Sequence, residues 1–168
     1  FGNVNEIFLT LRTWASWTIY KDLLAEHRSQ FKADAIWDIE SGSRLTGEEI
    51  GRALVQQGLL MERMRKFHER YEFLVCAVNQ VPAFDATVPW PKAIDGVTME
   101  NYVAWMKTTY WISTTCQPAI SVPAGFTDDG LPVGIQIVGR YRDDLNVLKC
   151  AHVFEQATGF GSRRPQGI

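Results

Sequence analysis

Two short apolar segments separated by a turn sequence constrain the fold of this chain more than any other feature. Residues 119–123 and 133–138 alternate between apolar and polar side chains and are rich in β-branched residues, which predicts two strands. Residues 127–130 between them read Thr-Asp-Asp-Gly, and the Asp-Gly pair tolerates the positive φ angles that a tight hairpin turn needs. The sequence therefore predicts an antiparallel hairpin in the last third of the chain.

The second strand of this hairpin carries an informative pattern of its own. Ile135 and Ile137 fall on one face of the sheet and Gln136 on the other, because successive side chains of a strand alternate. A polar side chain on a buried strand must find partners, so we expect Gln136 to make structural hydrogen bonds rather than substrate contacts. Gly134 and Gly139 interrupt the strand, which predicts close backbone packing or a bulge.

The rest of the chain predicts helices and one further strand. Apolar residues at helical spacing predict helices over residues 3–15, 20–31, 46–71, 98–112 and 144–158. Asn3 and Thr46 each have a glutamate three residues later, the pattern of a capping box. Residues 33–45 are mixed, with a loop expected at 41–43, and the apolar run 72–78 predicts a strand buried on both faces. The alternation of helices and strands indicates an α/β protein.

Composition excludes several classes of protein. The length of 168 residues suits one ordinary domain, and the apolar fraction of 46% is ample for a buried core. A net charge of −2 gives no reason to expect nucleic acid or an anionic membrane as partner, and no apolar run is long enough to span a bilayer. The three cysteines lack paired spacing, which favours reduced thiols and a cytoplasmic location.

The hairpin and the helix after it resemble the C-terminal signature of the amidase signature family of serine hydrolases. The family pattern Pro-Ala-x-Ser-x-Pro-x-Gly appears at residues 118–125, and Gly-Leu-Pro-x-Gly-x-Gln appears at 130–136. The following helix ends in Phe-Glu at 154–155, as in the family. A weaker match covers residues 46–78, where the family has a long helix and then a strand. The resemblance implies the C-terminal part of the amidase signature fold, a mixed β-sheet flanked by helices.

The resemblance also implies an activity. Members of the family hydrolyse the C–N bond of carboxamides through a serine acyl-enzyme, or act as the amide-cleaving subunit of an amidotransferase. Their two serines and lysine belong to a Gly/Ser-rich run upstream of this region, whereas the one Ser/Gly cluster here, at 41–44, lacks the glycines and the lysine. We therefore expect residues 1–168 to be the C-terminal portion of a single amidase domain, without catalytic residues and inactive alone. No cofactor or metal is implied.

Candidate substrate-binding residues follow from the resemblance as well. In the family, the helix before the Pro-Ala-x-Ser strand contributes to the pocket for the acyl side of a small-molecule amide. By position, that helix carries Tyr102, Trp105, Thr109 and Ser113. The alternative interpretation is that these side chains belong to the core or to an interface.

Two other hypotheses follow from the residue types alone. A thiol hydrolase could use Cys116 as nucleophile, His68 or His152 as base and Asp128 to orient the base. A metal site finds no support in the spacing of the histidines and cysteines.

A non-catalytic role is the third alternative, in which the chain acts only as a binding or structural module. A sheet cut from a larger one would have open edges and exposed apolar helix faces, and such surfaces promote association. We therefore expect the isolated chain to be a homo-oligomer, or to pair with the missing N-terminal portion or another chain.

Overall fold

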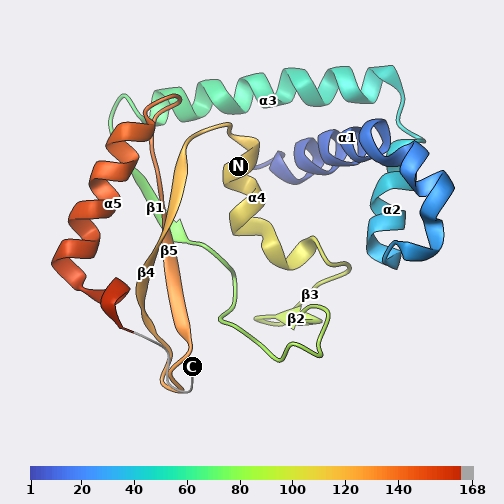
Figure 1. The fold of residues 1–168 in the computed structure, drawn as a ribbon. Coiled ribbons are helices and arrows are strands. Elements are labelled where there is room, and N and C mark those ends of the chain that lie inside the picture. The colour runs from blue at the N-terminus through green and yellow to red at the C-terminus, as the bar shows by residue number, and fades with distance from the viewer. Residues whose placement is uncertain (164–168) are drawn as a thin grey trace. The chain divides into compact units, whose positions relative to one another are not determined.

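The predicted hairpin is present in the computed structural model, which describes residues 1–163 (Figure 1). Its strands are β4 (Ala119–Phe126) and β5 (Pro132–Val138), and the turn between them contains Gly130 at φ +86°. Strand β1 (Leu74–Ala77) pairs with the other side of β5, so the sheet order is β1-β5-β4 with both pairings antiparallel. The prediction of a hairpin is confirmed, and β5 is the central strand.

The two faces of β5 have different partners, as the alternation in the sequence predicts. Ile137 lies opposite Ile120 in the register, and its face packs against α5 (Asp144–Thr158) with Val122 and Ala151 in the core. Ile137 and Val122 are only 1% and 2% exposed. Burying an aliphatic side chain of this size contributes about 1.5–3 kcal/mol, so this face holds α5 against the sheet. Helix α5 lies along one side of the sheet in Figure 1.

Gly139 allows α5 to approach the end of β5. A Cβ atom added there would collide with the side chain of Val147, which is itself 3% exposed. The expectation of close backbone packing is confirmed at this position. Helix α5 then ends as predicted at Gly159, which adopts the left-handed conformation at φ +64°.

The strand expected at residues 72–78 forms, but the prediction that it is buried on both faces is wrong. Strand β1 covers only Leu74–Ala77, and Val75 is 52% exposed. The reason is its place in the sheet, since among the described residues it pairs only with β5 and forms an edge. An apolar run by itself does not distinguish a central strand from an edge strand.

The long connection after β1 contains a small hairpin that we did not predict from the sequence. Strands β2 (Ala93–Ile94) and β3 (Val97–Thr98) are joined by Asp95-Gly96, both residues with positive φ. Asp-Gly is the usual pair for such a two-residue turn.

The helix expected from Thr98 therefore starts later. A short 3₁₀ turn, η2 (Ala104–Met106), leads directly into α4 (Lys107–Thr114). The side chain of Asn101 accepts hydrogen bonds from the N–H groups of Val103 and Ala104 and so caps the start of this helical segment.

The N-terminal part of the chain is helical throughout, which corrects two expectations. A single helix α1 (Val4–His27) replaces the two that were expected, and η1 (Arg28–Gln30) follows it. Helix α2 (Ala33–Gly42) occupies most of the segment that we expected to be mixed with a loop. No glycine or proline interrupts α1, and the hydroxyls of Thr13 and Thr18 donate to carbonyl oxygens four residues earlier, so its polar residues do not break it.

Polar contacts of Asp38 join α1 and α2. Its carboxylate accepts from Arg12 at 2.9 Å and from Ser16 at 2.6 Å, and the residue is 6% exposed. A buried carboxylate with two donors, one of them charged, has its desolvation offset by charge-assisted hydrogen bonds.

Of the two expected capping boxes, one forms. The N–H of Thr46 donates to the carboxylate of Glu49 at 2.8 Å, and the N–H of Glu49 donates to the hydroxyl of Thr46 at 3.2 Å, at the start of α3 (Gly47–Phe67). The hydrogen bonds that its carboxylate accepts from the N–H and the hydroxyl of Thr46 lower the pKa of Glu49. Asn3 makes no cap and instead donates to the side chain of Gln56 at 2.7 Å.

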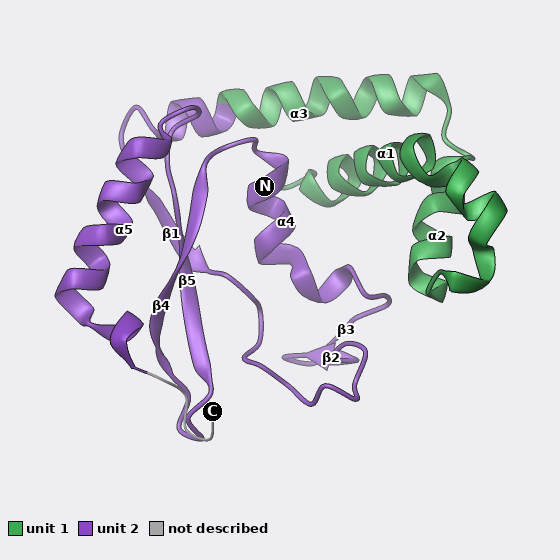
Figure 2. Cartoon of the chain, viewed as in Figure 1, with its two compact units in different colours: residues 1–62 green, residues 63–168 purple. Residues whose placement is uncertain are grey.

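The chain divides into two compact units, residues 1–62 and the remainder from Arg63, and α3 runs from the first into the second (Figure 2). The sheet, α4 and α5 all belong to the second unit. Among the helices of the described residues, none combines the length and the hydrophobicity that crossing a bilayer requires.

We predict that Gly42→Ala destabilises the protein, whereas Gly51→Ala in α3 does not. A Cβ atom at Gly42 would collide with the backbone carbonyl of Thr13, while one at Gly51 meets open space. We expect Gly42→Ala to lower the free energy of unfolding by about 1–3 kcal/mol and Gly51→Ala to raise it by up to about 1 kcal/mol. Urea denaturation of both variants tests this, and equal stabilities would contradict the close approach of α1 and α2.

Candidate functional site

A hollow of about 460 Å³ lies in the second unit beside the chain segment that leaves β1. Its lining comes from residues 77–84, from Trp105 in η2, and from residues 132–134 at the start of β5. None of these residues carries an ionisable side chain. An apolar concave site with a few polar groups is the usual form of a small-molecule site.

The structure brings only one of the four expected site residues to this hollow. Trp105 lines it, and Tyr102, 39% exposed, stands next to Trp105 with the ring centroids 6.2 Å apart. Thr109 and Ser113 lie further along α4 and do not line the hollow. The hydroxyl of Ser113 donates within the helix to the carbonyl of Thr109, so its visible role is local.

Aromatic rings build the wall around Trp105. Phe84 and Trp105 meet edge to face, with centroids 5.4 Å apart and ring planes at 86°. The rings of Trp90 and Tyr102 also meet edge to face. The ammonium of Lys92 lies 3.5 Å from the centroid of the Trp90 ring. Edge-to-face pairs add about 0.5–1.5 kcal/mol each beyond area burial, so these contacts stabilise the position of Trp105. The indole N–H of Trp105 is buried and has no acceptor among the described residues.

Helix α4 holds the segment that leaves β1. The hydroxyls of Thr108 and Thr109 both donate to the carbonyl of Val78, at 2.7 and 2.9 Å. The N–H of Lys107, the first residue of α4, donates to the side-chain oxygen of Gln80 at 2.7 Å. Three hydrogen bonds therefore fix residues 78–80, which form one side of the hollow.

Gln136 joins this network to the sheet. Its side-chain nitrogen donates to the carbonyls of Ala77 and Thr108, both at 3.0 Å, and the residue is 5% exposed. The expectation that Gln136 makes structural hydrogen bonds is confirmed. Cys76 lies opposite Gln136 in the register, and burial raises the pKa of the Cys76 thiol, which keeps it protonated at neutral pH.

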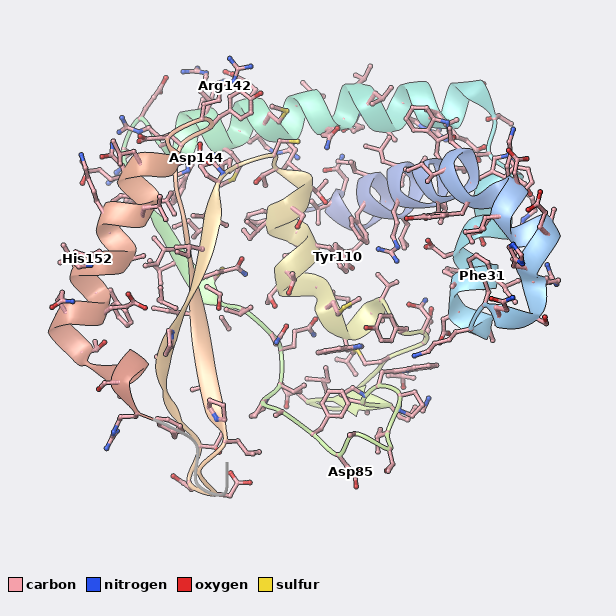
Figure 3. All side chains as sticks on the ribbon, viewed as in Figure 1. Phe31, Asp85, Tyr110, Arg142, Asp144 and His152 are labelled. Atoms are coloured by element: carbon pink, nitrogen blue, oxygen red, sulfur yellow. The ribbon has the colours of Figure 1, made fainter. Side chains whose placement is uncertain are left out.

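The thiol-hydrolase alternative has no support in the geometry. Cys116 precedes β4 and Asp128 follows it, so the eight residues of the strand separate them by roughly 25 Å. His68 is 4% exposed, and its Nδ1 donates to the carbonyl of Tyr71 at 3.0 Å, as a core histidine does. His152 is an exposed residue on α5 (Figure 3). In the described part of the chain, no three His, Cys, Asp or Glu side chains are arranged to hold a metal ion.

Comparison with known proteins assigns the family. A family model described as Amidase matches residues 14–148 of the chain. The chain belongs to the amidase family. This confirms the resemblance and the α/β fold expected from it.

Relatives of this amidase chain differ in activity. It is 34% identical over 128 residues to an acylamidase of Rhodococcus erythropolis, a match that covers 76% of the chain and 27% of the relative. It is 37% identical over 108 residues to one of the subunits of the glutamyl-tRNA(Gln) amidotransferase of Halalkalibacterium halodurans, covering 64% and 21%. A crystal structure of an amidase superposes with a TM-score of 0.82 at 23% identity, over 92% of the chain and 35% of that protein. The chain thus spans about a quarter of the length of these curated relatives.

The sequence pointed to Trp105, which lines the hollow, but not to Gln80 or Thr108. Nothing in the local pattern distinguishes these two side chains from ordinary loop and helix residues. Two amide side chains in a row directly after an apolar strand, Asn79-Gln80, were the available signal. Their roles depend on contacts with residues about 30 positions away, which periodicity does not reveal.

We predict that Gln136→Glu destabilises the protein in a pH-dependent way. Above the pKa of glutamate in an unfolded chain, about 4.3, a carboxylate would face two carbonyl oxygens without donating to either. Its pKa in the folded protein is therefore raised. The destabilisation should be smallest below about pH 4.3 and grow as the pH rises to the folded-state pKa.

Urea denaturation at pH 4 and pH 7 measures this effect. Gln156→Glu is the matched control, because Gln156 is exposed on α5. The substitution adds the same charge without removing a buried hydrogen bond. Equal loss of stability in the two variants at pH 7 would contradict the role of Gln136.

Proposed function

We propose that this chain is the C-terminal portion of an amidase domain and that it forms one wall of the pocket for a small amide. The observation that carries the proposal is the position of the hollow. It is lined by Trp105, which lies just before α4, and α4 is the helix that precedes the Pro-Ala-x-Ser strand. In the amidase signature family, that helix contributes to the acyl-side pocket.

The expected site residues take two roles in this proposal. Trp105 and Tyr102 contact the substrate through their rings. Thr109 supports the wall through its hydrogen bond to Val78, and Ser113 stands at the end of α4 that is further from the hollow. The network of Gln136 then keeps the wall in register with the sheet.

The reaction we propose is acyl transfer to a serine in the part of the domain that precedes these residues. The serine hydroxyl attacks the amide carbon, and a lysine base accepts its proton. Backbone N–H groups stabilise the oxyanion, the C–N bond breaks, and the amine leaves with a proton. Water then cleaves the ester, which releases the carboxylate and restores the serine.

A component of an amidotransferase is the second candidate, and the similarity to the glutamyl-tRNA(Gln) amidotransferase relative favours it. Such a protein would release ammonia from an amide donor and would need partner subunits. Turnover of glutamine that depends on an added partner, without turnover of simple amides, would support this alternative.

We predict that the natural protein that contains these residues hydrolyses small carboxamides and that residues 1–168 alone do not. The chain supplies a pocket wall, and in this proposal the nucleophile lies elsewhere. Release of ammonia or of an aromatic amine from a panel of amides measures the activity. Turnover by residues 1–168 alone would contradict the proposed division of roles.

The isolated chain should also associate with itself or with the rest of the domain. Large apolar side chains are exposed on several helices, among them Ile19, Val55, Leu145 and Val153. Such surfaces drive association when nothing covers them. Light scattering should give a mass above that of one chain, and a monomer at every concentration would contradict this expectation.

We predict that Cys116→Ala leaves amide hydrolysis by the natural protein within about twofold of its original rate. A thiol nucleophile would lose several orders of magnitude in kcat on the same change. The measurement is kcat/KM for one amide in both proteins, with circular dichroism to show that the variant is folded. Loss of activity in a folded variant would revive the thiol-hydrolase alternative.

A further inference from the structure

We propose that the hollow beside β1 selects uncharged amides with an apolar acyl or aryl group through its uncharged lining, and that Gln80 holds the bound amide by donating to the carbonyl oxygen of the ligand. The inference deepens the proposed function and rests on it only in calling the ligand a substrate. Its physical basis is the lining of the hollow, so the test measures ligand binding as well as amide turnover.

The first observation is the absence of charge from the wall. The lining is made of segments 77–84 and 132–134 and of Trp105, and it contains no acidic, basic or histidine side chain. A charged group that enters loses hydration, and no counter-ion in this lining compensates for the loss. An ammonium or carboxylate on the ligand is therefore disfavoured, as in glutamine, which carries both.

The second observation is the apolar character of most of the wall. Val81, Pro82, Phe84 and Val133 contribute hydrocarbon surface, and Trp105 adds an aromatic ring that Phe84 supports edge to face. The indole N–H of Trp105 is buried, so its ring rather than its polar edge is available to a ligand. This surface suits the alkyl or aryl part of an amide.

The third observation concerns the direction of the hydrogen bond that Gln80 can make. Its side-chain oxygen already accepts from the N–H of Lys107 at 2.7 Å. The oxygen keeps one further lone pair, whereas the NH₂ offers two hydrogens and only donates. A hydrogen bond from Gln80 to a ligand in the hollow is therefore donated to an acceptor, and the carbonyl oxygen is the acceptor that every amide carries.

Gln80 is also held in place before a ligand arrives. The bond to Lys107 fixes its side chain, and the hydroxyls of Thr108 and Thr109 fix the backbone two residues earlier, at Val78. A donor that is already oriented loses little conformational entropy on binding, so its contribution to affinity is retained. Asn79 is exposed, and its side-chain oxygen is 3.4 Å from the Thr109 hydroxyl, so it is the less constrained of the two amides.

The test uses two ligands of equal size and two variants of equal charge. Hexanamide and 5-aminopentanamide differ in one terminal group, a methyl against an ammonium. Gln80→Glu keeps an oxygen that can accept from Lys107 and replaces the donor with a second oxygen. Gln156→Glu adds the same charge at an exposed position of α5 outside the hollow. Dissociation constants come from calorimetry on the natural full-length protein, and kcat/KM from ammonia release.

We expect the natural protein to bind hexanamide at least about tenfold more tightly than 5-aminopentanamide. Gln80→Glu should weaken the binding of hexanamide by about tenfold or more, because it removes the donor to the carbonyl. It should also reduce the preference for hexanamide, because it adds a negative charge to the lining. Gln156→Glu should leave both constants unchanged. Thermal unfolding of Gln80→Glu near that of the natural protein shows that the contact with Lys107 survives.

Equal binding of the two ligands, no binding of either, or the same result for both variants would overturn the inference. These outcomes are distinct from failure of the proposed function. Selective binding that Gln80→Glu abolishes, without any hydrolysis, would support the inference and reject the amidase activity. Hydrolysis that is indifferent to the ligand charge and to Gln80→Glu would do the reverse.

Discussion

The buried amide of Gln136 is the interaction on which the arrangement of the second unit depends. It donates to Ala77 at the end of β1 and to Thr108 in α4, two carbonyls that lie 59 and 28 residues away in the sequence. A buried carbonyl without a donor costs about 1–3 kcal/mol, so the strand and the helix are both held where this side chain reaches them. The hydroxyls of Thr108 and Thr109 then fix the chain that leaves β1.

The two faces of the sheet thus have separate tasks. One face is apolar, and α5 covers it through a core that includes Val122 and Ile137. That face provides stability without directional precision, because burial of hydrocarbon depends on area more than on angle. The other face carries Gln136 and contacts α4 through hydrogen bonds, which depend strongly on distance and direction. The wall of the hollow is attached to this second face, so directional hydrogen bonds fix its position.

The relatives of this chain represent two different activities. An acylamidase and a component of an amidotransferase resemble this chain to similar degrees, at 34% and 37% identity. Identity at this level does not choose between them. The ligand preference that we propose for the hollow would distinguish them, since its apolar lining around Trp105 offers no counter-ion to the charged groups of glutamine.

Local sequence was enough to predict the hairpin of β4 and β5, the alternation around Gln136, the capping box of Thr46 and the end of α5, because each depends on neighbours within a few residues. It also pointed to Trp105, through the resemblance to a family. Three other features became apparent only in the folded chain: β1 forms an edge of the sheet, α1 is continuous, and Lys107 holds Gln80. These features depend on contacts between segments far apart in the chain, and such contacts leave no period or local spacing in the sequence.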